Sequence, residues 1–97
     1  MPAYITLCKF TQQGLANIKG SPERTKQAKE AAAKMGGRYI GVWWTMGEYD
    51  LVVVGEGPDD QTMMLSLLQS AGLGNVTTMT MRAFSEDEFA QIVAKLP

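Results

Sequence analysis

The chain has 97 residues, of which nine are Lys or Arg and ten are Asp or Glu, and its sequence pI is near 5.3. This length is typical of one domain, expected here over residues 1–97, and the balanced charge excludes a basic surface for nucleic acid. There is no histidine and one cysteine, Cys8. We therefore expect no intrachain disulfide, no metal site and no cofactor.

The N-terminal segment lacks the charge and the long apolar run of a signal peptide, and no stretch is long enough for a membrane span. A lone cysteine is compatible with a reducing compartment. The sequence thus predicts a cytoplasmic protein that does not contact a membrane.

The first third of the chain predicts a strand, a loop and a helix. Residues 3–10 alternate in polarity, which indicates a strand, and residues 11–20 predict a loop with one helical turn at most. Ser21-Pro22-Glu23 predicts a helix start, with Ser21 as the N-cap and Pro22 at the first helical position. Gly36-Gly37 ends this helix. Its apolar stripe consists of Thr25, Ala28, Ala31, Ala32 and Met35.

Residues 38–56 predict two strands joined by a tight turn at Gly47-Glu48. The second of these strands, Asp50 to Val54, is apolar on both faces. Residues 57–60 break it and begin a second helix, which ends at Gly72 and whose expected apolar stripe is Met64, Leu67, Leu68 and Ala71.

The last third of the chain predicts a fourth strand over residues 75–84 and a third helix. Ser85-Glu86-Asp87-Glu88 has the pattern of a capping box. An apolar stripe follows it, formed by Phe89, Ile92, Val93 and Leu96.

The element order βαββαβ with a terminal helix predicts an α+β, ferredoxin-like fold with a four-stranded antiparallel sheet. The expected spatial order of the strands is fourth, first, third, second, with two helices on one face. We expect the helices to cover Ile5, Leu7, Ile40, Val42, Trp44, Leu51, Val53, Met79 and Met81. The expected open face holds Tyr4, Thr6, Cys8, Phe10, Trp43, Thr45, Asp50, Val52, Val54, Glu56, Thr78, Thr80 and Arg82.

Such an open face would expose Trp43, Tyr4, Phe10, Val52 and Val54 together. A patch of that size is unusual on a soluble monomer, and burying each large apolar side chain contributes roughly 1.5–3 kcal/mol. The same face of a second copy is the simplest cover. The sequence therefore predicts a homodimer or higher homo-oligomer in which facing sheets form a dimeric α/β barrel.

The tetrapeptide Gly47-Glu48-Tyr49-Asp50 resembles the motif that names the GYD-domain family. Further matches in the expected order are Thr11 with Gly14, Ser21-Pro22-Glu23-Arg24, Gly36-Gly37, Thr45, Glu56, Pro58-Asp59 and Thr80 with Ala83-Phe84. The resemblance covers most of the chain. It implies a small bacterial or archaeal protein of the ferredoxin-like, dimeric α/β-barrel type and implies little about activity.

Five residues are candidates for ligand binding in the barrel interior: Tyr4, Trp43, Asp50, Glu56 and Arg82. No catalytic residue is assigned, and the two candidates for proton transfer are Asp50 and Glu56. Each has a structural alternative. Asp50 would accept backbone N–H groups near the turn. Glu56 and Arg82 would form an ion pair within or between subunits, and Trp43 would belong to an interface core.

Two further side chains have competing interpretations. Cys8 is a nucleophile or a buried, inert thiol, and the absence of a histidine to activate it favours the second. Arg24 lies in the first turn of its helix, where the helix dipole disfavours a positive charge. It either pairs with a carboxylate elsewhere or is solvated at the surface.

Three functions compete on this evidence. The first, which we favour, is a homo-oligomer that binds a small molecule between its sheets in a regulatory or carrier role. The second is an enzyme, similar to cofactor-independent monooxygenases or isomerases, that uses the interior cavity. The third is a structural assembly with a filled interior.

Overall fold

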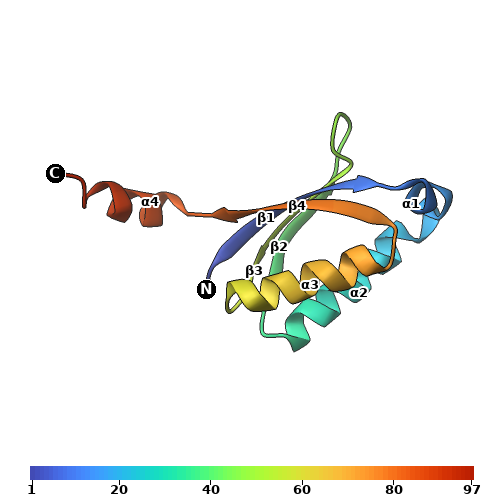
Figure 1. Cartoon of the computed structure of the whole chain (residues 1–97), viewed down its shortest axis with the longest axis horizontal. Coiled ribbons are helices and arrows are strands. Elements are labelled where there is room, and N and C mark those ends of the chain that lie inside the picture. Colours follow the sequence, from blue (N-terminus) through green and yellow to red (C-terminus); the bar gives the residue numbers. More distant parts are fainter.

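The computed structural model describes residues 1–97. Its sheet contains β1 (Ala3–Phe10), β2 (Arg38–Trp44), β3 (Leu51–Glu56) and β4 (Val76–Ala83), all antiparallel and in the spatial order β2-β3-β1-β4. Two helices, α2 (Ser21–Lys34) and α3 (Asp60–Gly72), lie on one side of this sheet (Figure 1). The short α1 (Gln12–Ala16) and a 3₁₀ turn (Ile18–Gly20) precede α2, and α4 (Glu86–Val93) follows β4. This architecture confirms the predicted α+β, ferredoxin-like fold and its strand order.

Most helix boundaries follow the predicted signals. The Asp59 side chain accepts a hydrogen bond from the Thr62 backbone N–H at 2.8 Å, and Ser85 and Glu88 form the predicted capping box. The prediction that Ser21 caps α2 is wrong. Gly20 occupies the N-cap position, and the Ser21 hydroxyl instead accepts a hydrogen bond from the indole N–H of Trp44 at 3.0 Å.

The β2–β3 pairing has the register that a turn at residues 47–48 requires, with Trp43 opposite Val52. The predicted tight turn is replaced by a loop of residues 45–50, because the paired strands end at Trp44 and Leu51. A bulge interrupts this ladder between Tyr39 and Gly41. The bulge places Tyr39 against the helix side, where it lines a cavity, and leaves Ile40 52% exposed. The prediction that Ile40 lies under the helices is therefore wrong, because Tyr39 takes that side of the sheet.

The predicted facing of β1 and β4 is wrong as well. Tyr4, Thr6 and Cys8 are buried and line the space beneath the helices, together with Thr78 of β4. The open side of β1 carries Ile5 and Leu7, which lie opposite Met81 and Met79. Residues directly opposite in an antiparallel pair share a face of the sheet. Because side chains alternate between faces, assigning one residue of β1 to the wrong face assigns all of β1 and β4 wrongly.

The helices bury different amounts of their predicted stripes. Four of the five predicted α2 residues line the cavity, namely Thr25, Ala28, Ala32 and Met35. The prediction for α3 is largely wrong, because Met64 and Leu68 are 57% and 62% exposed. The inner face of α3 instead consists of Thr62, Met63, Ser66, Leu67 and Ser70.

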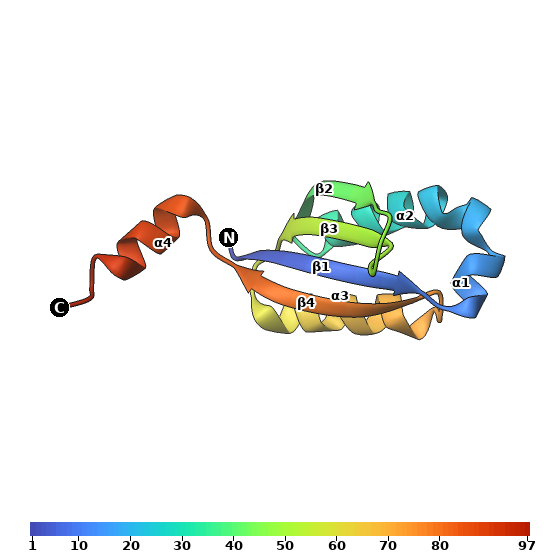
Figure 2. The same cartoon turned by 90° about the horizontal axis from the view of Figure 1, so that it is seen from above.

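Beyond β4 the chain forms an arm, residues 84–97, that extends away from the sheet and carries α4 (Figures 1 and 2). Its apolar side chains are exposed, Phe89 by 60% and Leu96 by 70%. No helix of the structure has both the length and the apolar character that a membrane crossing needs.

Candidate functional site

The side of the sheet opposite α2 and α3 is not covered by any helix (Figure 2). We call it the open sheet face. Trp43, Met79 and Met81 on this face are 55%, 45% and 43% exposed. Its apolar members are Ile5, Leu7, Trp43, Val52, Val54, Met79 and Met81. This composition is more uniformly apolar than the sequence predicted, because the exchange of faces on β1 and β4 removes hydroxyl groups from it.

A loop of residues 45–50, which contains the Gly47-Glu48-Tyr49-Asp50 motif, stands on the open side of the sheet (Figure 1). Lys9 holds it through an ion pair with Glu48, with 3.7 Å between Nζ and Oε1, and lies 5.1 Å from the centre of the Tyr49 ring. Gly47 has a φ of 118°, a conformation that glycine adopts without strain. The motif therefore shapes a rim at one end of the open sheet face.

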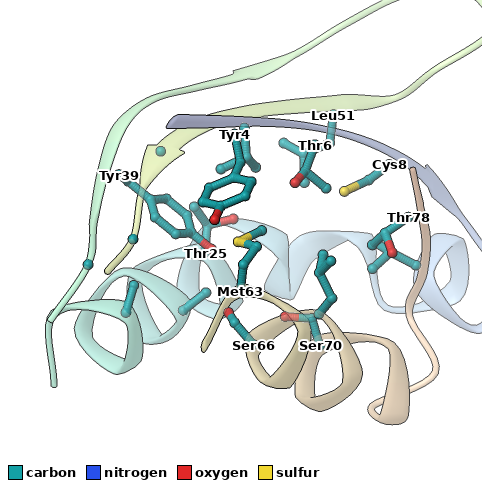
Figure 3. Close-up of a pocket in the computed structure, with 18 of the residues that line it drawn as sticks. Tyr4, Thr6, Cys8, Thr25, Tyr39, Leu51, Met63, Ser66, Ser70 and Thr78 are labelled. Atoms are coloured by element: carbon teal, nitrogen blue, oxygen red, sulfur yellow. The ribbon is translucent and has the colours of Figure 1, made fainter. Parts of the chain in front are cut away.

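A cavity of about 170 Å³ lies between the sheet and the two helices (Figure 3). It exists because α2 packs on β2 and α3 packs on β4, the two edge strands, which leaves space above the central strands β1 and β3. Apolar side chains form much of its wall. Hydroxyl groups from both layers also line it, including those of Thr6, Thr25, Ser66, Ser70 and Thr78.

Tyr4 and Arg82 lie near one end of this cavity and engage other groups. The Tyr4 hydroxyl donates a hydrogen bond of 2.5 Å to Asp60 Oδ1, and burial together with this bond raises the pKa of Tyr4 to about 12. Arg82 donates hydrogen bonds to the carbonyls of Ala3 and Ala83. Its guanidinium lies 5.8 Å from the centre of the Tyr4 ring, so it stabilises this end of the sheet.

The two candidate carboxylates, Asp50 and Glu56, also bond to other groups of the chain. Glu56 pairs with Arg38 across β2 and β3, with 3.1 Å between Oε2 and Nε, and this hydrogen bond keeps the pKa of Glu56 below its ordinary value. Asp50 Oδ2 accepts the backbone N–H of Phe10 at 2.9 Å. This bond matches the structural alternative predicted for Asp50. Within the chain Glu56 pairs with Arg38 and not with Arg82.

The five predicted site residues therefore do not converge. Trp43 lies on the open sheet face, Tyr4 and Arg82 lie on the helix side, and Asp50 lies at the opposite end of β1 from both. The prediction placed Thr6 and Thr78 on the open face and named none of the hydroxyl groups of α3. A signal for them exists in the sequence, because Thr62, Ser66 and Ser70 recur every four residues and so form one polar stripe on α3.

Cys8 is a buried free thiol whose pKa burial raises from its ordinary value of 9.0 to about 11. At pH 8 or below the native protein then holds about a hundredfold less thiolate than an exposed cysteine does. We expect a disulfide reagent such as dithionitrobenzoate to label native Cys8 at least a hundredfold more slowly than the urea-unfolded chain at the same pH. Equal rates in the two states would contradict its burial.

Arg24 is the one candidate whose bonding is incomplete. Its Nη1 donates to the Asn17 carbonyl at 2.8 Å, which joins α2 to the end of α1. Its Nη2 is enclosed and has no hydrogen-bond partner. Neither sequence interpretation fits, because Arg24 contacts no carboxylate and is partly buried where it lines the cavity.

The chain is thus a small ferredoxin-like α+β domain in which one apolar face of the sheet is uncovered. The chain belongs to the GYD-domain family, whose pattern matches residues 4–93. This confirms the resemblance drawn from the tetrapeptide motif and the matches around it.

A more particular likeness is to a Thermus thermophilus protein named glutamine synthetase and cystathionine beta-lyase binding protein. The two chains are 33% identical over 97 residues, which is 99% of each. No solved structure matches the chain.

Proposed function

We propose that this protein is a homo-oligomeric binding protein that regulates metabolic enzymes by contact and carries out no chemistry of its own. The observation that carries this proposal is the open sheet face, whose apolar side chains nothing in the chain covers. A large exposed apolar surface on a soluble protein marks an interaction site.

The open sheet faces of two copies would cover each other in a dimeric α/β barrel. The aliphatic and methionine side chains on this face suit a filled interface better than a polar ligand. This supports the filled-interior alternative for this surface. The bonds of Asp50 and Glu56 to backbone and to Arg38 give the enzyme alternative little support.

The α4 arm supports assembly independently. An isolated helix of eight residues is unstable in water, and α4 exposes Phe89, Ile92 and Val93 by 60%, 45% and 43%. Because the arm extends away from its own sheet, a neighbouring copy is the surface that would cover these side chains.

The outer face of α3 provides a second exposed apolar surface, away from the open sheet face. Met64, Leu65 and Leu68 on it are 57%, 51% and 62% exposed. The similar Thermus protein is named for binding glutamine synthetase and cystathionine beta-lyase. We propose that enzymes of these two kinds bind to the outer face of α3.

Size-exclusion chromatography with light scattering tests this proposal with purified glutamine synthetase and cystathionine beta-lyase from the same organism. We expect the protein to elute with at least one enzyme, and we expect Leu68→Glu to weaken that binding tenfold or more, since an interface anchor contributes about 2 kcal/mol. The matched control is Gln69→Glu, which adds the same charge to the neighbouring position. It should bind normally, and both variants should keep the oligomeric mass.

Two results would count against the proposal. If the oligomer binds neither enzyme, the regulatory function is wrong. If Leu68→Glu binds as well as the unaltered chain does, the docking surface is not on α3.

A further inference from the structure

We propose that the cavity between the sheet and the helices binds a small carboxylic acid with an apolar body, and that Arg24 holds its carboxylate. The cavity lies inside one chain, so this binding requires neither the oligomer nor an enzyme partner. The structure supports the site through its size, its wall and its charge.

The cavity is large enough for a single ring or a branched aliphatic group. Its volume is about 170 Å³, and an apolar cavity of roughly 150 Å³ in a protein interior admits benzene. The small side chains of α2, Ala28 and Ala32, leave this space unfilled because they do not reach the central strands.

The wall combines apolar surface with groups that donate and accept hydrogen bonds. An apolar lining is provided by Leu51 and Val53 of β3, Leu67 of α3 and Met35, the C-cap residue of α2. Thr25, Ser66 and Ser70 add hydroxyl groups from the two helices (Figure 3). A wall of this kind suits a ligand with an apolar body and one polar end.

The charge of the cavity sets the chemistry of that polar end. Its charged lining residues are Arg24, Arg38 and Glu56, and Arg38 already pairs with Glu56. Arg24 therefore remains as an unbalanced positive charge. Its enclosed Nη2 lacks a partner, and an unmet donor of this kind is costly. A carboxylate would balance this charge, and it would accept the free N–H groups once the guanidinium turns toward the cavity.

A titration with benzoate, with benzyl alcohol as an uncharged analogue of similar size, tests the site. We expect benzoate to shift the amide NMR signals of cavity residues saturably and to raise the melting temperature. Arg24→Gln should weaken benzoate binding at least tenfold and leave binding of benzyl alcohol unchanged. The matched control Lys26→Gln removes an exposed charge from the same helix, outside the cavity, and should bind benzoate normally.

A second variant tests the cavity without altering Arg24. Ser66→Leu would fill part of the space and should abolish binding of both compounds. The proposal is overturned if benzoate gives no saturable shift at millimolar concentration, if Arg24→Gln binds it normally, or if the shifted signals map to the open sheet face. Enzyme binding is measured separately, so its failure would leave this result intact.

Discussion

Replacing Trp43 by Glu is expected to convert the oligomer into a monomer or an aggregating chain. Trp43 lies opposite Val52 on the open sheet face and is 55% exposed in the single chain. In the proposed face-to-face assembly its ring would be buried, and a tryptophan is among the residues that contribute most to an interface. A carboxylate there loses that contribution and would also have to leave water, at a cost of several kcal/mol.

Native mass spectrometry measures this effect directly through the number of subunits. The control is Gln69→Glu, because Gln69 is exposed on α3, on the other side of the sheet, and the substitution adds the same charge. We expect that control to keep the subunit number of the unaltered chain. A folded Trp43→Glu oligomer of unchanged mass would show that the interface lies elsewhere.

The fold was predictable because its signals are local and agree with one another. Gly36, with a φ of 84°, ends α2 where predicted, and Asp59 and Ser85 cap the helices that follow them. The order of the elements then leaves few topologies. Ser21 was misread because its hydroxyl bonds to Trp44, a tertiary contact that local sequence does not reveal.

Local signals did not predict which side chains of β1 and β4 lie under the helices. Apolar character placed Ile5 and Leu7 beneath the helices, yet hydroxyl-bearing Thr6 and Thr80 share a hydrogen bond of 2.8 Å on the helix side. The assumption that the more apolar face lies under the helices fails when both faces of a sheet are covered, and the proposed assembly would cover the second one.

The assumption that the more apolar face is the buried one also explains why the sequence did not predict the cavity. The periodicity of α3 predicts that Met64 and Leu68 are buried, yet both are exposed, and Thr62, Ser66 and Ser70 line the cavity instead. A helix with one apolar stripe and one hydroxyl stripe can present either to the sheet, and periodicity alone does not decide between them. Arg24 was the one residue whose sequence position already indicated a mismatch, because its charge opposes the helix dipole.

Gly14→Ala is expected to destabilise the protein by about 3 kcal/mol, through a clash that cannot relax cheaply. A Cβ at Gly14 would lie 2.0 Å from the Asn75 carbonyl oxygen, which is backbone and cannot rotate away. That oxygen also accepts the Thr11 N–H at 3.0 Å, and Gln13 Nε2 donates to the Leu73 carbonyl at 2.9 Å. The added methyl would therefore push α1 away from the start of β4 and break this set of bonds.

Urea unfolding measures the change as a lower midpoint with an unchanged slope. The matched control is Gly72→Ala at the end of α3, where a Cβ would meet no atom within 4 Å. Alanine favours the helix there by up to about 1 kcal/mol, so this control should be as stable as the unaltered chain or more stable. Equal midpoints for the two variants would refute the clash. Because Asn17, at the end of α1, accepts the hydrogen bond from Arg24, a displaced α1 should also weaken benzoate binding in Gly14→Ala.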